Sequence, residues 1–193
     1  MELLEEKIRR EGKIFEGDVL KVDGFVNHRI DVAFMSEMGK ELARRFAGES
    51  VTKILTIEAS GIGVACVAAL QFPGVPPVVF AKKSASKNMS GDVYASEVFS
   101  YTRGRKYDIM VSKEHLSADD KVLIIDDFLA KGSALLSLIH VCEQAGAQIV
   151  GAGILIEKAY QCGGDLVRKE KGIRVESLAR IASMDPQKGI EFC

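Results

Sequence analysis

Apolar and polar positions divide the chain into an amphipathic start followed by a regular succession of buried segments. Residues 2–11 (ELLEEKIRRE) and 36–47 (SEMGKELARRFA) carry apolar side chains at helical spacing. Ser36 is a candidate N-cap for the second of these helices. The segment 19–31 (VLKVDGFVNHRID) alternates too weakly to predict a strand. We therefore expect two helices before the first strand of a sheet.

From residue 52 the pattern becomes regular. Residues 93–102 and 107–112 alternate and predict a hairpin-like pair. The other segments read as buried strands (TKILTIEA, PPVVFAK, KVLIID and QIVGAGILIEK) and intervening helices (GIGVACVAALQF and GSALLSLIHVCEQAG). Apolar strands that alternate with helices predict an α/β fold, with a mostly parallel sheet covered by helices on both faces. Ligands in such sheets bind outside the carboxyl ends of the strands.

Composition narrows the class of protein. A chain of 193 residues with 47% hydrophobic content can bury one substantial core, so we expect a single domain. A net charge of -1 gives no electrostatic reason to expect a nucleic-acid or membrane partner. The first residues, MELLEEKIRREGK, lack the apolar run of a signal peptide or spanning helix, which favours a cytoplasmic protein. The four cysteines show no C-x-x-C spacing for zinc or dithiol chemistry.

The strongest chemical signal is VLIIDDFLAKGSA, residues 122–134. Asp126 and Asp127 follow buried apolar residues, where two carboxylates are costly unless a partner meets them. Ribose hydroxyls, or a magnesium ion, would be suitable partners. The loop Ala130, Lys131, Gly132, Ser133 and Ala134 then leads into a helix N-terminus, which favours anion binding. Together these features predict a ribose 5-phosphate site, and the alternative is that the acids only cap the helix.

A second junction of strand and helix, TIEASGIG at 56–63, offers backbone amides for a diphosphate at Ala59, Ser60 and Gly61. Glycine near a strand end is also common in plain turns, so this signal is weaker. Lys82 and Lys83 close the next strand and are candidates to neutralise diphosphate charge, with no choice between them. Residues 84–92 (SASKNMSGD) are small and polar, which predicts a flexible loop.

Residues 122–134 resemble the phosphoribosyl pyrophosphate signature of the type I phosphoribosyltransferases. The resemblance extends over nearly the whole chain to the xanthine-specific branch of that family, through segments 19–31, 56–65, 78–83, 125–132, 154–158 and 174–181. It implies a phosphoribosyltransferase fold with a small hood, mainly 1–35 and 173–193, and a core of about 36–172. It also implies a homodimer and Mg²⁺ bound with the diphosphate substrate, with no metal held directly by side chains.

The same resemblance assigns roles to further residues. It places Leu20, Asn27 and Lys158 against the purine, and the loop 84–92 over the active site. The charge of Lys158 would suit an exocyclic purine oxygen or a xanthine anion, although a lysine that ends a strand is often only solvated. In this scheme Asp126 and Asp127 are the catalytic acids.

The chain departs from the commonest signature at Ala130 and Lys131, where threonines are usual. Hypoxanthine and guanine enzymes of the family carry an acidic general base there, and Ala130 cannot accept a proton. A base that loses its ring proton easily is then expected, and xanthine is the most acidic of the common purines. We therefore predict conversion of xanthine to xanthosine 5′-monophosphate, with guanine or hypoxanthine as the alternative substrates.

A non-catalytic regulator that senses phosphoribosyl pyrophosphate is the alternative from another class. Such regulators resemble this chain through the same signature but carry an added DNA-binding domain. Only about fifty residues precede the predicted sheet, which leaves little room for a winged-helix module. An enzyme is therefore the preferred prediction.

Overall fold

A computed structural model of the chain describes residues 1–83, 92–100 and 104–193. Of the predicted flexible loop 84–92, all but Asp92 lies outside the described residues. Within the described part, no helix is long and apolar enough to cross a membrane.

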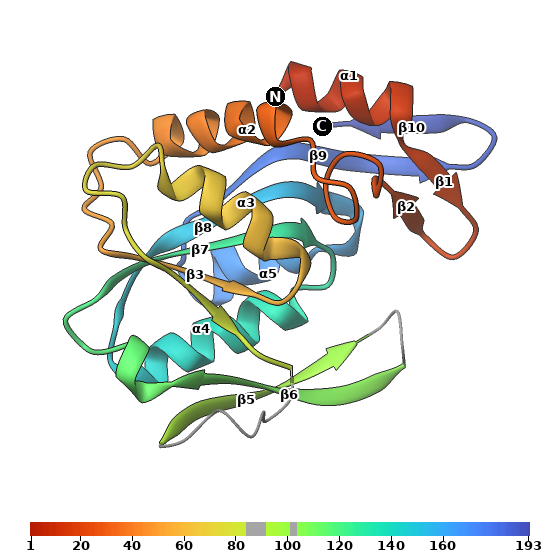
Figure 1. Cartoon of the computed structure of the whole chain (residues 1–193). Helices are drawn as coiled ribbons and strands as arrows, with labels where there is room; N and C mark the ends of the chain where they lie inside the picture. Colours follow the sequence, from red (N-terminus) through yellow and green to blue (C-terminus); the bar gives the residue numbers. More distant parts are fainter. Residues whose placement is uncertain (84–91, 101–103) are drawn as a thin grey trace.

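A six-stranded sheet organises the molecule (Figure 1). Its strands, in spatial order, are β10 (Gly189–Phe192), β9 (Val175–Asp185), β8 (Gln148–Lys158), β7 (Lys121–Leu129), β3 (Lys53–Ile57) and β4 (Val78–Ala81). All neighbouring pairs are parallel except β10 and β9, which are antiparallel. The prediction of a mostly parallel sheet is confirmed.

Alternate residues of the central strands face two separate apolar cores. Leu123 and Ile125 of β7 belong to the core beneath α1 (Glu2–Glu11), α2 (Val32–Arg45) and α3 (Ser60–Ala69). Val122 and Ile124 belong to the core on the other face, beneath α4 (Ser133–Ala145) and α5 (Gly163–Glu170). Because both faces are covered, the middle of each central strand is apolar at successive positions rather than at every second one. This explains why the sequence shows continuous apolar runs.

The predicted hairpin is confirmed as β5 (Val93–Ser100) and β6 (Arg105–Ser112), paired antiparallel. It packs against α4 at the edge of the molecule (Figure 1). Short 3-10 turns follow β6 (Lys113–His115) and β8 (Ala159–Gln161).

The start of α2 differs from the prediction. The helix begins at Val32 because the Asp31 side chain accepts a hydrogen bond of 3.1 Å from the backbone N–H of Phe34. Ser36 lies inside the helix, so its predicted N-cap role is wrong. Residues 35 and 36, where the hood is predicted to meet the core, both lie in α2, and the division into hood and core stays a prediction.

The two ends of the chain lie together at one side of the sheet (Figure 1). The N-terminal α1 packs against β9 and β10, and a small antiparallel pair, β1 (Lys13–Phe15) and β2 (Val19–Lys21), follows it. Leu4, Ile8 and Leu20 share one apolar core with the central strands. This arrangement brings the N-terminal segment close to the carboxyl ends of the parallel strands, and its role as a hood stays a prediction.

Candidate functional site

Asp127 joins three segments that are distant in sequence. Its Oδ2 accepts a hydrogen bond of 3.0 Å from Asn27 Nδ2, and its Oδ1 accepts one of 3.0 Å from Ser60 Oγ. The side chain is 5% exposed, and β7 extends to Leu129 rather than ending before the acids. The predicted residues Asn27, Ser60 and Asp127 therefore meet at one point. Both partners are small polar groups that hydroxyls of a sugar could replace.

Asp126 occupies a different environment, beneath the N-terminus of α3. Its Oδ1 accepts a 2.9 Å hydrogen bond from the backbone N–H of Asp127, and the residue is 6% exposed. Burial raises the pKa of the Asp126 carboxyl well above its usual value, and the nearby negative charge of Asp127 raises it further. Asp126 is thus suited to hold a proton, whereas Asp127 offers a hydrogen-bonded carboxylate.

Gly61 allows the close approach of α3 to these acids. A Cβ atom at Gly61 would lie 2.1 Å from Thr56 Oγ1 and 2.9 Å from Asp126 Oδ1, so no larger residue fits. The Thr56 hydroxyl is buried and, within the described ranges, has no hydrogen-bond partner. The glycine of the TIEASGIG segment therefore has a packing reason here, beyond a turn.

The loop 130–134 has the form of an anion site. Gly132 adopts a φ of 88°, in the left-handed region that favours glycine, and α4 begins at the next residue, Ser133. The backbone N–H of Gly163 donates a 3.1 Å hydrogen bond to the carbonyl of Ala130. A Cβ at Gly163 would lie 2.2 Å from that carbonyl oxygen, so the loop rests directly on the start of α5.

A recess of about 580 Å³ opens beside these groups. Its lining comes from the N-terminal segment, the loop between β3 and α3 (the second loop) and the residues after β4: Asp23, Asn27, His28, Glu58, Ala59, Ser60 and Lys83. The Glu58–Ala59 peptide bond is cis, and Glu58 Oε1 accepts a 2.6 Å hydrogen bond from the backbone N–H of Lys83. The second loop and Lys83 are thereby brought together.

The two adjacent lysines, Lys82 and Lys83, line different cavities. Lys83 is exposed and lines this recess, while its charge acts on the Asp126 carboxyl. Lys82 exchanges two backbone hydrogen bonds of 2.9 Å with Met110 and lines a separate cavity of about 590 Å³ beside β4. The cavity beside β4 lacks Asn27 and Ser60, the two hydrogen-bond partners of Asp127, whereas both line the recess of about 580 Å³, which is therefore the candidate site.

Lys158 ends β8 and is half-buried against the N-terminal segment. Its Nζ donates to the backbone carbonyl of Asp18 and lies 6.0 Å from the centre of the Phe128 ring. Burial lowers the pKa of Lys158. The carboxylate of Asp18 is also 3.4 Å from the Tyr160 hydroxyl. An aromatic ring beside a half-buried cation can accommodate a planar, electron-rich base.

The structure does not bring the three predicted purine residues together. Lys158 contacts the turn at Asp18, and Asn27 contacts Asp127. Leu20 is 7% exposed and packs in the apolar core. Their roles at a purine stay predictions.

Several residues of the site were missed from the sequence. Gly163, Asp18 and Phe128 contact predicted site residues. Gly163 and Asp18 belong to segments with little periodicity, and Phe128 lies in the segment 122–134 but was given no role. The pair Gly163–Gly164 after Cys162 was the available signal, since adjacent glycines often mark close backbone packing. The contacts of Asp18 span about 140 residues, and no local pattern predicts them.

Comparison with known proteins gives the family. A family model described as "Phosphoribosyl transferase domain" matches residues 33–170. The chain is 55% identical over 185 residues to a protein named xanthine phosphoribosyltransferase from Ruminiclostridium cellulolyticum, covering 96% of each chain. It is 53% identical over 193 residues to one of the same name from Bifidobacterium animalis subsp. lactis, covering 100% of this chain and 99% of that protein.

Solved structures with the same fold are more distant in sequence. An adenine phosphoribosyltransferase from Rhodothermus marinus superposes with a TM-score of 0.73 at 19% identity, covering 93% of this chain and 98% of that one. The APRTase from Giardia lamblia, complexed with 9-deazaadenine, superposes with a TM-score of 0.66 at 28% identity. The match covers 78% of this chain and 81% of that one. The first of these likenesses supports the fold alone.

Proposed function

This chain belongs to the phosphoribosyltransferase family, and from that membership we propose that it is a xanthine phosphoribosyltransferase. It joins xanthine to phosphoribosyl pyrophosphate, giving xanthosine 5′-monophosphate and diphosphate. The observation that carries this proposal is the meeting of Asp127 with Asn27 and Ser60, beside two loops at helix N-termini. The choice of xanthine rests on near full-length likeness to proteins of that name.

The substrate's sugar would bind at Asp127. Ribose hydroxyls are hydrogen-bond donors, and a carboxylate accepts them as it now accepts Asn27 and Ser60. The 5-phosphate would lie on the amides of residues 130–134, where α4 begins and its dipole favours an anion. The negative charge of Asp127 would also stabilise positive charge that develops on the sugar as the bond to diphosphate breaks.

The diphosphate would occupy the recess at the start of α3. Amides of Ala59, Ser60 and Gly61 and the charge of Lys83 support that assignment, and Lys83 is favoured over Lys82 by its place in the recess. Among the described residues no group of three acidic, histidine or cysteine side chains forms a metal cluster. Phosphate oxygens are typical ligands of Mg²⁺, so we propose that the ion enters with the diphosphate and neutralises its charge.

The purine would lie between Lys158, the Phe128 ring and the N-terminal segment. N9 of the base forms a bond to C1′ of the ribose, the C1′–oxygen bond to diphosphate breaks, and the N9 proton leaves to solvent. Ala130 offers no acceptor for that proton, which suits an acidic base such as xanthine. Lys158 would stabilise negative charge on the exocyclic oxygens. Residues 1–35 and 173–193 would act as the hood over this site.

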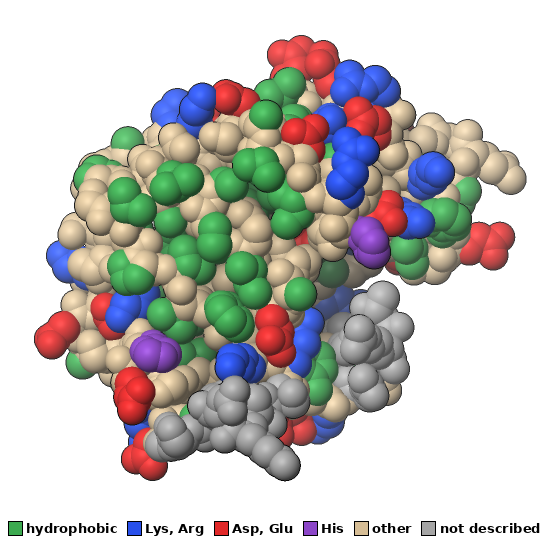
Figure 2. Space-filling view, viewed as in Figure 1, with side chains coloured by type: hydrophobic (Ala, Val, Ile, Leu, Met, Phe, Trp, Pro, Cys, Tyr) green, Lys and Arg blue, Asp and Glu red, His purple; other side chains and the backbone are tan. Residues whose placement is uncertain are grey.

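We further propose a cytoplasmic homodimer. Exposed apolar side chains occur at the start of α2, the end of α3, the segment leading to β4 and β4 itself, including Val32, Leu70, Val75 and Phe80. Figure 2 shows hydrophobic side chains spread over this face. The helix α3 carries apolar residues on all sides although Cys66 and Leu70 are exposed, which favours cover by a second copy.

Incubation of the protein with phosphoribosyl pyrophosphate, xanthine and Mg²⁺ tests the function. We expect xanthosine 5′-monophosphate and diphosphate to form in equal amounts. Binding of phosphoribosyl pyrophosphate without product would favour the regulator instead.

A further inference from the structure

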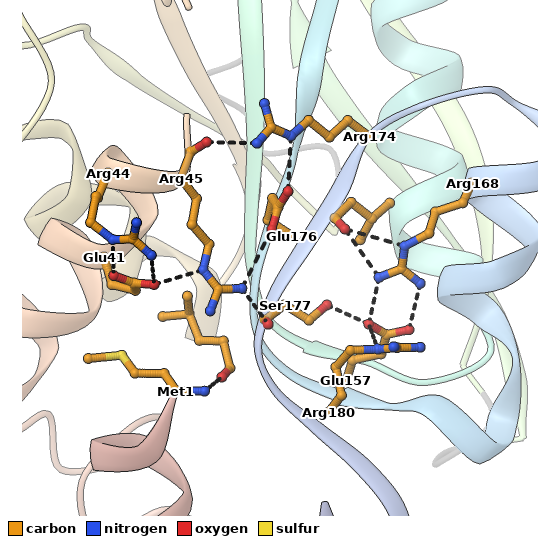
Figure 3. A network of polar contacts seen from close by, with 12 residues as sticks. Met1, Glu41, Arg44, Arg45, Glu157, Arg168, Arg174, Glu176, Ser177 and Arg180 are labelled. Carbon is orange, nitrogen blue, oxygen red and sulfur yellow. Dashed lines mark hydrogen bonds and ion pairs between the residues drawn. The ribbon is translucent and has the colours of Figure 1, made fainter. Parts of the chain in front are cut away.

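Glu157 is a buried carboxylate that the proposed reaction does not use. It is the penultimate residue of β8, 1% exposed, and lies on the α5 face of the sheet (Figure 3). Arg168 donates to both of its oxygens at 2.9 and 2.8 Å. Its Oε2 also accepts hydrogen bonds from Ser177 Oγ at 2.6 Å and Arg180 Nε at 3.2 Å.

These partners keep Glu157 charged. Burial alone would raise the pKa of the Glu157 carboxyl, but the hydrogen bonds of Arg168 and Ser177 and the nearby arginine charges lower it below its usual value. A buried ion pair is weak support for stability, because apolar residues of similar volume often serve as well. The two parallel hydrogen bonds from Arg168 do fix the orientation of the Glu157 carboxylate, since a planar guanidinium binds a carboxylate in a defined geometry.

The network is in direct contact with the start of α5. A Cβ at Gly164 would lie 2.1 Å from Glu157 Oε1 and 2.6 Å from Arg168 Nη1, so the helix backbone rests on this ion pair. The preceding residue, Gly163, donates to Ala130 and packs on the loop 130–132. The position of the loop therefore depends on the position of Glu157.

Lys158, the proposed purine-binding lysine, directly follows Glu157 in β8. Successive residues of a strand point to opposite faces, so fixing one side chain fixes the origin of the next. The same carboxylate thus holds the strand end that carries the purine lysine and the helix that supports the phosphate loop.

We propose that Glu157 is a positioning residue that sets the distance between the 5-phosphate loop and Lys158. This rests on the proposed function, since it assigns the two ends of one nucleotide to those groups. A nucleotide that spans both ends needs the correct spacing, whereas a ligand that reaches only one end does not.

The test compares two ligands on Glu157→Gln, measured by calorimetry on the full chain. We expect the affinity for xanthosine 5′-monophosphate to fall by about tenfold or more, because small misplacements of a bound group cost that much. The affinity for ribose 5-phosphate, which reaches one end only, should change less than about threefold. Arg168→Lys keeps the charge but loses the planar fork, and should give the same pattern more weakly.

Glu176→Gln is the matched control. Glu176 precedes Ser177 in β9, the strand beside β8, and its carboxylate contacts Arg174 at 3.0 Å and Arg45 at 3.5 Å, neither of which belongs to α5 (Figure 3). We expect wild-type affinity for both ligands in this variant. If Glu157→Gln fails to fold, Arg168→Lys decides.

Equal losses for both ligands, no loss for either, or the same pattern in Glu176→Gln would overturn the positioning role. Measurements on the wild-type chain distinguish failure of the positioning role from failure of the proposed function. If it binds ribose 5-phosphate but neither binds nor forms xanthosine 5′-monophosphate, the function is wrong and this inference with it.

Discussion

Asp126 and Asp127 are neighbours in sequence but have different surroundings, and we expect this difference to give them different roles. Asp127 accepts hydrogen bonds from Asn27 and Ser60, both at the edge of the recess. Asp126 faces Gly61 and Thr56 under α3, where burial raises its pKa. These contacts support the proposal that Asp127 binds the sugar, while Asp126 packs against the start of α3.

Replacing Asp127 with asparagine should remove most turnover. The amide keeps the size of the side chain but loses the negative charge and one hydrogen-bond acceptor. Both would otherwise stabilise the positive charge that develops on the sugar. We expect kcat to fall by about a hundredfold to a thousandfold, the range seen when one such stabilising group is lost. Steady-state kinetics with xanthine gives this value. The exposed Asp119→Asn serves as control, and unchanged turnover in Asp127→Asn would contradict the assignment.

The raised pKa of Asp126 predicts a pH-dependent cost in stability. Its folded-state pKa lies above the unfolded value of about 3.9, so its contribution to folding is most favourable below that pH. The contribution is lost as the pH rises toward the folded pKa. Asp126→Asn removes this loss, so the stability of the variant relative to wild type should increase as the pH rises from about 5 to about 8. Urea unfolding at both pH values measures it, and a difference independent of pH would contradict the prediction.

At the scale of elements, the sequence predicts most of the central sheet and fails where distant contacts decide. Gln148–Lys158 is a strand over the predicted residues, because its apolar run is long and ends in charge. The helix α5 was not predicted, since GGDLVRKE begins with two glycines and depends on the contact of Arg168 with Glu157. The start of α2 was misplaced because Ser36 and Asp31 are both good N-caps, and only the fold selects Asp31.

The residues of the candidate site likewise divide into those that a local pattern predicts and those that distant contacts bring together. The acid pair and the loop 130–134 were predictable because they form one contiguous segment after a buried run. The contact between Asn27 and Asp127 spans 100 residues, and no spacing in the sequence predicts it from the residues alone. Lys82 and Lys83 were indistinguishable because neighbours in a strand differ only in the face to which they point.

The support of the phosphate loop by α5 makes a prediction at this scale. Gly163→Ala would place a Cβ 2.2 Å from the Ala130 carbonyl oxygen, so the loop must move. We expect the KM for phosphoribosyl pyrophosphate to rise by about tenfold or more, with a smaller change in the KM for xanthine. Initial rates at varied substrate concentrations measure both.

Gly172→Ala, just past the end of α5, is the control for this variant. Its φ of 63° makes alanine costly, by about 1 kcal/mol, yet nothing lies within 4 Å of the added atom. It should lose stability without a change in either KM. A similar rise in KM for both variants would mean that general destabilisation, rather than loop support, is responsible.

For the whole molecule, the exposed apolar face around α3 predicts association of two copies. Sedimentation equilibrium should give twice the 21.0 kDa mass of one chain. Leu70, which is 66% exposed, lies at the end of α3, and Leu70→Glu would place a charge within the contact. We expect this variant to sediment as a monomer, while Glu2→Gln on α1 leaves the dimer intact. A wild-type monomer at micromolar concentration would contradict the proposal.

The central claim is conversion of xanthine, and a comparison of purines tests it most directly. The measurement is kcat/KM for xanthine, guanine, hypoxanthine and adenine with phosphoribosyl pyrophosphate and Mg²⁺, following nucleotide formation. We predict that xanthine exceeds every other base, because Ala130 supplies no proton acceptor and Lys158 stabilises an anionic base. Equal or greater kcat/KM with guanine, hypoxanthine or adenine would contradict this account.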